Sequence, residues 1–127
     1  MRLLLIDDEP LIGVFIRRVA ETSGFEVQIT TEPNAFKAAC TAFDPDVISL
    51  DLSMPDCDGI ELLRYLAEIG CRAQILIASG FDHKVLESAR DLGEARGLAM
   101  AGVISKPICL AELHALLESV REASRRD

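Results

Sequence analysis

Two neighbouring acids, a third acid, a hydroxyl and an amine each follow a short apolar stretch of this chain. They are Asp7 and Asp8, Asp51, Ser79 and Lys106. Carboxylate oxygens are the ligands that hard divalent cations prefer, and hydroxyl and ammonium groups donate hydrogen bonds to phosphoryl oxygens. If the fold brings these side chains together, they can hold a cation and a phosphoryl group at one site.

Strands are predicted where apolar residues run continuously, or alternate with polar ones, between turn-forming residues. They are expected at residues 3–6, 25–30, 47–50, 74–78 and 102–105. Helical spacing of apolar residues predicts helices between and after them, at residues 10–23, 32–41, 59–69, 82–96 and 108–122. Leu110 in the last helix is expected to face the core.

The alternation of strands with helices predicts an α/β fold, doubly wound, with one parallel sheet and helices on both of its faces. Residues 25–30 alternate between apolar and polar, which places that strand near the sheet edge. Parallel strands bring their carboxyl ends to one edge of the sheet, where ligands of open α/β sheets bind. The other four strands therefore deliver all the reactive side chains to a common place.

The length and net charge of the chain argue against several classes of function. At 127 residues the chain fits one domain. A net charge of -8 argues against nucleic acid as a direct partner, because binding a phosphate backbone needs clustered Lys and Arg. No apolar run approaches the length that spans a membrane, and Asp7, Asp8 and Glu9 end the first one too early for a signal peptide. We expect a cytoplasmic protein with no membrane partner.

The four cysteines show no C-x-x-C pattern and no zinc-like pairing with histidine. We expect Cys40, Cys71 and Cys109 to be small, mostly buried apolar residues in a reducing compartment. Cys57, in the loop that follows Asp51, is expected to be the most exposed of the four.

The three acids predict a magnesium site, with manganese as the other candidate ion. Three carboxylates about 5 Å apart would repel by roughly 3 kcal/mol per pair at an effective dielectric constant near 20. A divalent cation removes that cost, and an all-oxygen site suits Mg²⁺ or Mn²⁺. We expect Asp8 and Asp51 to bind the ion, with Asp7 contributing directly or through water.

The same residues permit phosphoryl transfer. Lys106 and Ser79 can hold the oxygens of a phosphoryl group while Asp51 attacks phosphorus and forms a mixed anhydride. Each residue also has a purely structural interpretation. Asp51 can be a turn former, Lys106 can pair with an acid, and Ser79 can be the N-cap of the helix that follows it.

Four motifs resemble the receiver domain of two-component response regulators. They are Asp7-Asp8, Asp51 with Met54-Pro55 and Gly59 behind it, Ser79-Gly80 and Lys106-Pro107. The resemblance covers residues 1–122 and leaves 123–127 as a C-terminal tail or the start of a linker. It implies a flavodoxin-like (βα)5 fold with a five-stranded parallel sheet in the order 2-1-3-4-5.

The resemblance also implies a signalling domain rather than an enzyme. Asp51 would be the phosphoacceptor for a histidine kinase or a histidine phosphotransfer protein. Magnesium would bind Asp7, Asp8, Asp51 and the backbone carbonyl of Ser53. Ser79 would be the switch hydroxyl, Lys106 would bind the phosphoryl group, and the peptide bond before Pro107 would be cis.

Two departures from the family pattern concern the output. Val103 stands where many members have a switch aromatic, and residues 98–101 are interpreted as an insertion after Gly97. The resemblance implies an output face formed by residues 82–96, 102–105 and 108–122. Phosphorylation would switch this face to control an unidentified output protein or C-terminal domain, and a homodimer could form through it.

Two other functions fit the same residues. An aspartyl-phosphate phosphohydrolase would need a second acid two residues after the nucleophile, where this chain has Ser53. An interaction module with a receiver-like fold would never be phosphorylated, but such modules usually lose the acids or the lysine, and here Asp7, Asp8, Asp51 and Lys106 are all present.

Overall fold

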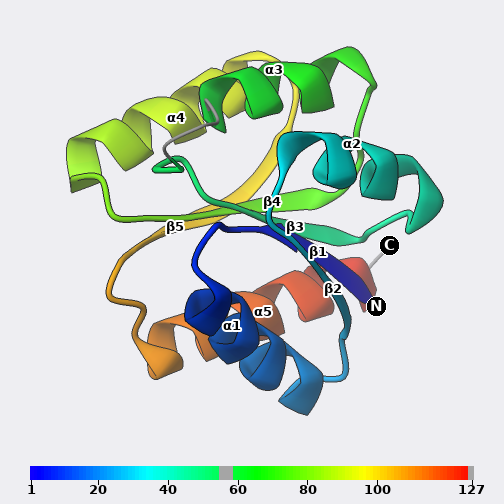
Figure 1. Ribbon diagram of the computed structural model, residues 1–127, viewed down its shortest axis with the longest axis vertical. Coiled ribbons are helices and arrows are strands. Elements are labelled where there is room, and N and C mark those ends of the chain that lie inside the picture. The colour runs from blue at the N-terminus through cyan, green and yellow to red at the C-terminus, as the bar shows by residue number, and fades with distance from the viewer. Residues whose placement is uncertain (55–58, 126–127) are drawn as a thin grey trace.

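The computed structural model describes residues 1–54 and 59–125, and it places a parallel sheet between two layers of helices (Figure 1). The strands are β1 (Arg2–Ile6), β2 (Glu26–Thr30), β3 (Val47–Leu50), β4 (Gln74–Ser79) and β5 (Ala99–Ser105). The helices are α1 (Pro10–Thr22), α2 (Pro33–Ala42), α3 (Gly59–Glu68), α4 (His83–Ala95) and α5 (Leu110–Arg125). In Figure 1, α1 and α5 cover one face of the sheet, and α2, α3 and α4 cover the other.

The sheet order is β2-β1-β3-β4-β5, and every neighbouring pair is parallel. This confirms the predicted flavodoxin-like, doubly wound fold. Leu50 pairs with Ile6 on one side and with Ile77 on the other. β1 and β3 therefore end level with each other, β4 continues two residues further to Ser79, and the residues at these ends lie at one edge of the sheet.

Two apolar cores hold the layers together, one on each face of the sheet. Phe36 is fully buried beneath α2, in the core that also takes Leu62 and Leu66 from α3. Leu113 and Leu117 of α5 are fully buried in the other core. Strands β1 and β3 are buried on both faces, which is why they read as continuous apolar runs.

Strand β5 begins at Ala99 rather than at Gly102, so the predicted start of this strand was wrong and residues 99–101 belong to it. Ile75 pairs with Met100 and the next residue, Leu76, pairs with Gly102. Ala101 is thus an extra residue in β5, and a β-bulge accommodates it without breaking the strand pairing. Leu98, which comes before the strand, is buried in the core that α4 covers.

Two predictions of burial were also wrong. Leu110, expected to face the core, is 58% exposed: it is the first residue of α5 and lines an open cavity between α1 and α5 instead of the core. Cys109 is exposed, whereas Cys40 and Cys71 are half-buried. Cys57 lies outside the described residues. Within residues 1–54 and 59–125, no helix is long and apolar enough to cross a membrane.

Candidate functional site

Three carboxylates meet at the carboxyl ends of β1 and β3. One oxygen from each of Asp7, Asp8 and Asp51 can be chosen so that all three lie within 4.8 Å of one another. Asp7 and Asp51 are each only 2% exposed, whereas Asp8 is open to solvent. The predicted cluster of acids is therefore present, with two buried members and one at the surface.

Lys106, which follows β5, enters the same cluster. Its Nζ lies 2.9 Å from Asp7 Oδ2 and 3.3 Å from Asp51 Oδ2. A third acid, Glu9, holds the same ammonium group at 3.2 Å through Oε1. Glu9 was not among the site residues predicted from the sequence. Its place two residues after Asp7, at the same strand end, was the signal that could have identified it.

The electrostatics of the cluster follow from an excess of negative charge. Burial raises the pKa of Asp7 and the charge of Asp51 raises it further, although hydrogen bonds from Lys106 and from the Glu9 backbone act in the opposite direction. Burial alone would lower the pKa of Lys106, but its contacts with Asp7, Asp51 and Glu9 raise it above the ordinary value. One lysine does not neutralise the acids around it.

This donor set fits a divalent cation. All the grouped ligand atoms are carboxylate oxygens, which suits Mg²⁺ or Mn²⁺ and not a metal that prefers sulfur or imidazole. Lys106 is the one cation in contact with Asp7 and Asp51 among the described residues, so a divalent cation would supply further positive charge to the three acids. Asp7, Asp8 and Asp51 would hold it. That the Ser53 backbone carbonyl also binds the cation remains a prediction.

The two carboxylate oxygens of Asp51 have different surroundings. Oδ1 accepts hydrogen bonds from the backbone N–H of Ser53, at 2.9 Å, and from its hydroxyl, at 2.8 Å. Oδ2 faces Lys106. Only the carbonyl of Ser53 was considered from the sequence, so its hydroxyl was missed. A serine two residues after an aspartate commonly closes such a local turn, and that spacing was the available signal.

Ser79 is the last residue of β4 and is completely buried. Its Oγ accepts a hydrogen bond from Phe81 N at 3.4 Å, and its carbonyl accepts one from Lys106 N at 2.8 Å. The alternative that Ser79 caps the next helix is wrong, because the side chain of Asp82 caps α4 by accepting from Val85 N. The Ser79 hydroxyl thus remains at the sheet edge, beside the loop that carries Lys106.

The remaining two predicted positions lie on or next to β5. The Lys106–Pro107 peptide bond is cis, as the resemblance implied. Val103 is half-buried and packs against the core that α4 covers.

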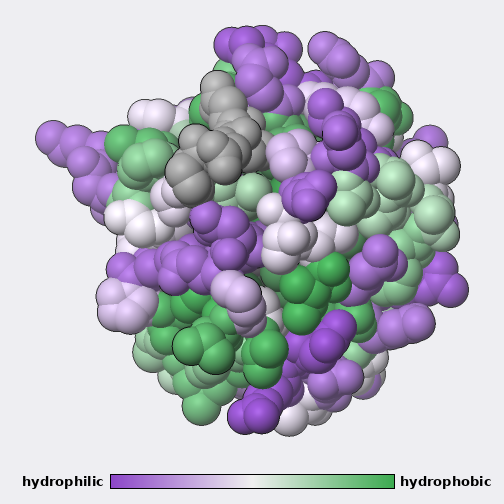
Figure 2. All heavy atoms as spheres, viewed as in Figure 1, coloured by the Kyte–Doolittle hydropathy of each residue, from purple (hydrophilic) through white to green (hydrophobic). Residues whose placement is uncertain are grey.

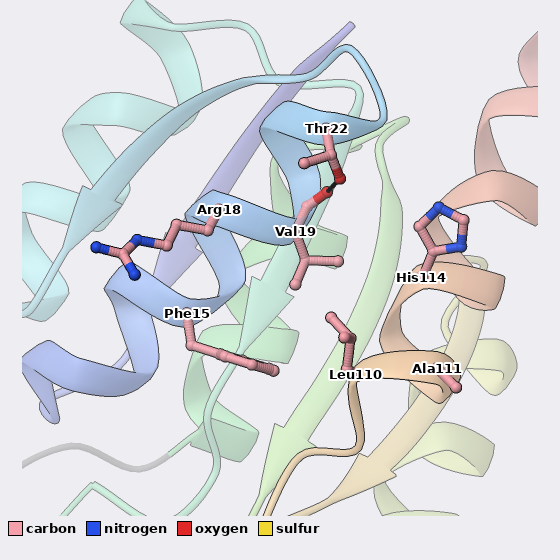
Figure 3. A pocket seen from close by; sticks show the side chains of 7 residues that line it. All are labelled: Phe15, Arg18, Val19, Thr22, Leu110, Ala111 and His114. Atoms are coloured by element: carbon pink, nitrogen blue, oxygen red, sulfur yellow. Dashed lines mark hydrogen bonds between the residues drawn. The ribbon is translucent and has the colours of Figure 1, made fainter.

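A cavity of about 620 Å³ lies away from this cluster, between α1 and α5 (Figure 3). Phe15, Val19 and Leu110 contribute most of its apolar lining, with His114 at its side. Figure 2 shows hydrophobic side chains gathered over the layer that contains α1 and α5. The five side chains from which the site was predicted do not line this cavity. The cavity is therefore separate from the predicted site at the sheet edge.

Comparison with known families gives one match that covers most of the chain. The response regulator receiver domain matches residues 3–118. The transcriptional regulatory protein QseB of Escherichia coli O157:H7 is 33% identical over 94% of this chain and 52% of its own length. The cell cycle response regulator CtrA of Brucella ovis is 32% identical over 92% of this chain and 50% of its own. The chain spans about half the length of the curated relatives it matches.

Solved structures show the same architecture. A response regulator from Colwellia psychrerythraea superposes with a TM-score of 0.82 at 35% identity, covering 99% of this chain and 98% of that one. The receiver domain of the Francisella response regulator 1452 superposes with a TM-score of 0.80 at 23% identity, covering 97% and 98%. The second similarity is one of fold alone.

Proposed function

We propose, from the premise that this chain belongs to the response regulator receiver domain family, that Asp51 accepts a phosphoryl group from a histidine kinase or a histidine phosphotransfer protein. The observation that supports this most directly is the position of Asp51. Its carboxylate is almost fully buried, lies 3.3 Å from the Lys106 ammonium group and shares a cluster with Asp7 and Asp8. A nucleophile, a cation site and a phosphate-binding amine therefore adjoin one another.

In the proposed reaction, a carboxylate oxygen of Asp51 attacks the phosphorus of a phosphohistidine. The P–N bond breaks, the imidazole nitrogen leaves with the electron pair, and a mixed anhydride forms on Asp51. Lys106 must loosen its contacts with Asp7 and Asp51 to follow the oxygens of the transferred group. The phosphoryl oxygens would replace those carboxylates as anionic acceptors for its ammonium group.

Asp7, Asp8 and Asp51 would hold Mg²⁺ or Mn²⁺, with the backbone carbonyl of Ser53 as a further ligand. The ion would offset the negative charge that builds on the phosphoryl oxygens. The two buried acids fix the geometry of the site, and Asp8 opens it to solvent.

Ser79 is the proposed switch residue, because its hydroxyl lies at the end of β4 and its bond to Phe81 N is long at 3.4 Å. A phosphoryl group on Asp51 would offer that hydroxyl a charged acceptor, and the loop leading into α4 would follow it. With Val103 in place of an aromatic ring, the shift must reach the surface through this loop and α4.

The output face would comprise α4, β5 and α5. A groove of about 460 Å³ lies on it, with His83, Glu87 and Arg90 on one side, Val103 in its floor and Glu112 on the other side. The partner would be an output protein, an output domain in the same polypeptide or a second copy of this chain. A transcriptional output is stated for QseB by its name, and for this chain it remains a proposal. We place its action in the cytoplasm.

The test is intact-mass measurement after incubation with Mg²⁺ and acetyl phosphate. One phosphoryl adduct should appear on the wild type and on Asp91→Asn, an exposed acid on α4, but not on Asp51→Asn. Absence of an adduct on the wild type would indicate an interaction module that is not phosphorylated. Turnover of many equivalents of donor would instead indicate a phosphohydrolase.

A further inference from the structure

The Ser53 side chain lies between the proposed phosphoacceptor and the loop that follows β4. Its Oγ donates to Asp51 Oδ1 at 2.8 Å and accepts from Gly80 N at 3.5 Å. The Ser53 backbone N–H also donates to Asp51 Oδ1, at 2.9 Å. One hydroxyl thus connects the carboxylate of β3 to the loop of the switch residue.

Resting on the proposed function, we infer that the Ser53 hydroxyl blocks the position that a phosphoryl oxygen must take, and that it has to rotate away before Asp51 can be phosphorylated. A phosphoryl group on Asp51 carries three oxygens, and they must be directed toward the groups that bind them. Lys106 lies on one side of Asp51 and the Ser79–Gly80 loop on the other. Ser53 Oγ is between Asp51 and that loop.

The donor that this hydroxyl occupies is one that a phosphoryl oxygen would need. Backbone N–H groups at turns bind anionic oxygens well because they carry fixed partial positive charge. While the hydroxyl is in place, Gly80 N donates to Ser53 Oγ. Rotation of the Ser53 side chain about χ1 would free Gly80 N for the incoming oxygen, whereas the backbone N–H of Ser53 would keep its bond to Asp51 Oδ1.

The Ser53 residue is half-buried and is not fully enclosed by the protein. A Cβ placed on Gly80 would have Ser53 Oγ, at 4.0 Å, as its nearest neighbour beyond the adjoining residues. No other side chain of the described residues is as close to that face of the loop. Ser53 Oγ is therefore the group that a phosphoryl oxygen would displace on this side of Asp51.

Displacement carries an energetic cost that slows phosphorylation. The hydrogen bond from the hydroxyl to the Asp51 carboxylate is short and charge-assisted, and such bonds contribute more to stability than neutral ones. Removing the hydroxyl should accelerate adduct formation about fivefold, less than one such bond is worth, because the rotated hydroxyl of the wild type regains a hydrogen bond to water. The hydroxyl would thus act as a brake on the reaction, and Ser53 as a positioning residue for Asp51.

The experiment compares Ser53→Ala and Ser53→Thr with the wild type, using Ser119→Ala, an exposed serine on α5, as the matched control. The rate of adduct formation with acetyl phosphate and saturating Mg²⁺ is followed by intact mass. Ser53→Ala should react about fivefold faster, while Ser53→Thr, which keeps the hydroxyl, and the control should match the wild type. Thermal unfolding of each variant identifies any loss of fold.

A second readout does not depend on a phosphodonor. Beryllium trifluoride is a tetrahedral mimic of a phosphoryl group, and its equilibrium affinity for Asp51 should rise about fivefold in Ser53→Ala and remain unchanged in Ser53→Thr. A slower or unchanged rate in Ser53→Ala, with unchanged affinity, would overturn the inference and leave the proposed function standing. Absence of any adduct in all the proteins would overturn the proposed function, and the inference with it.

Discussion

The Lys106 ammonium group is closer to Asp7 Oδ2, at 2.9 Å, than to Asp51 Oδ2, at 3.3 Å. The lysine that should bind the phosphoryl group is thus held by an acid on a different strand. Asp7 keeps Lys106 at the site before any phosphoryl group arrives, and it also competes with that group for the same amine.

Asp7→Asn should make the metal-free protein more stable at pH 7, by about 1 kcal/mol. Burial and the charge of Asp51 raise the pKa of Asp7, so its ionised form destabilises the fold. As the pH falls through the raised pKa, Asp7 takes up a proton in the folded protein and the loss of stability diminishes. The loss is fully relieved below the ordinary pKa of 3.8. The stability difference between Asp7→Asn and the wild type should therefore narrow toward acid pH, measured by urea unfolding at a series of pH values. Asp91→Asn is the control, and a destabilised Asp7→Asn at pH 7 would contradict the electrostatic account.

Millimolar Mg²⁺ should raise the melting temperature of the wild type at neutral pH. A ligand that binds only the folded state stabilises it by about 2.7 kcal/mol at one hundred times its dissociation constant. Asp8→Asn should lose most of this effect, although its side chain is exposed and contributes little to the metal-free fold. Scanning calorimetry with and without the ion, at matched ionic strength, is the measurement. An equal shift in both proteins would exclude Asp8 as a ligand.

Lys106→Met should destabilise the metal-free protein by about 3 kcal/mol, because it leaves buried carboxylates without their counter-charge. Asp7 and Asp51 lose an ion pair in this variant. Mg²⁺ should recover part of the loss. Lys84→Met, on the exposed face of α4, is the matched control and should change stability little. The measurement is chemical denaturation with and without Mg²⁺. An equal loss of stability in both conditions would show that Lys106 contributes through packing and not through its charge.

Gly59→Ala should destabilise the fold by about 2 kcal/mol and weaken Mg²⁺ binding. A Cβ on Gly59 would lie 2.7 Å from the backbone Cα of Leu52, the residue directly after Asp51. The loop that orients Asp51 would have to move. Gly80→Ala, with no atom nearer than 4.0 Å beyond the adjoining residues, is the control. Similar melting temperatures and Mg²⁺ affinities in the two variants would show that the loop can move without loss of stability or of Mg²⁺ binding.

Iodoacetamide should label Cys109 well before Cys40. Burial and, to a smaller extent, the nearby Cys71 raise the pKa of Cys40 to about 11, so its reactive thiolate is scarce at neutral pH. Cys109 is exposed. Labelling of Cys40 should increase as the pH rises toward that value. Peptide mass spectrometry over time provides the measurement, and early modification of Cys40 at pH 7 would contradict its burial.

The convergence of Asp7, Asp8, Asp51 and Lys106 could be predicted because parallel strands bring their carboxyl ends to one edge of the sheet. The sheet order was implied by the family resemblance. The surroundings of the site residues could not be predicted. Side-chain torsions decide that Glu9 reaches Lys106 and that the Ser53 hydroxyl turns back to Asp51, and no periodicity encodes such torsions. The bulge at Ala101 was missed for a related reason, because the sequence pattern does not show where one extra residue interrupts the pairing of a strand.

The unequal exposure of the three carboxylates implies a path for the proposed cation. Since Asp8 meets solvent while Asp7 and Asp51 do not, a hydrated ion would meet Asp8 first and would lose water on moving toward the inner pair. It would leave by the reverse path. The outermost acid would then govern how quickly the ion exchanges, and the inner pair how firmly it is retained.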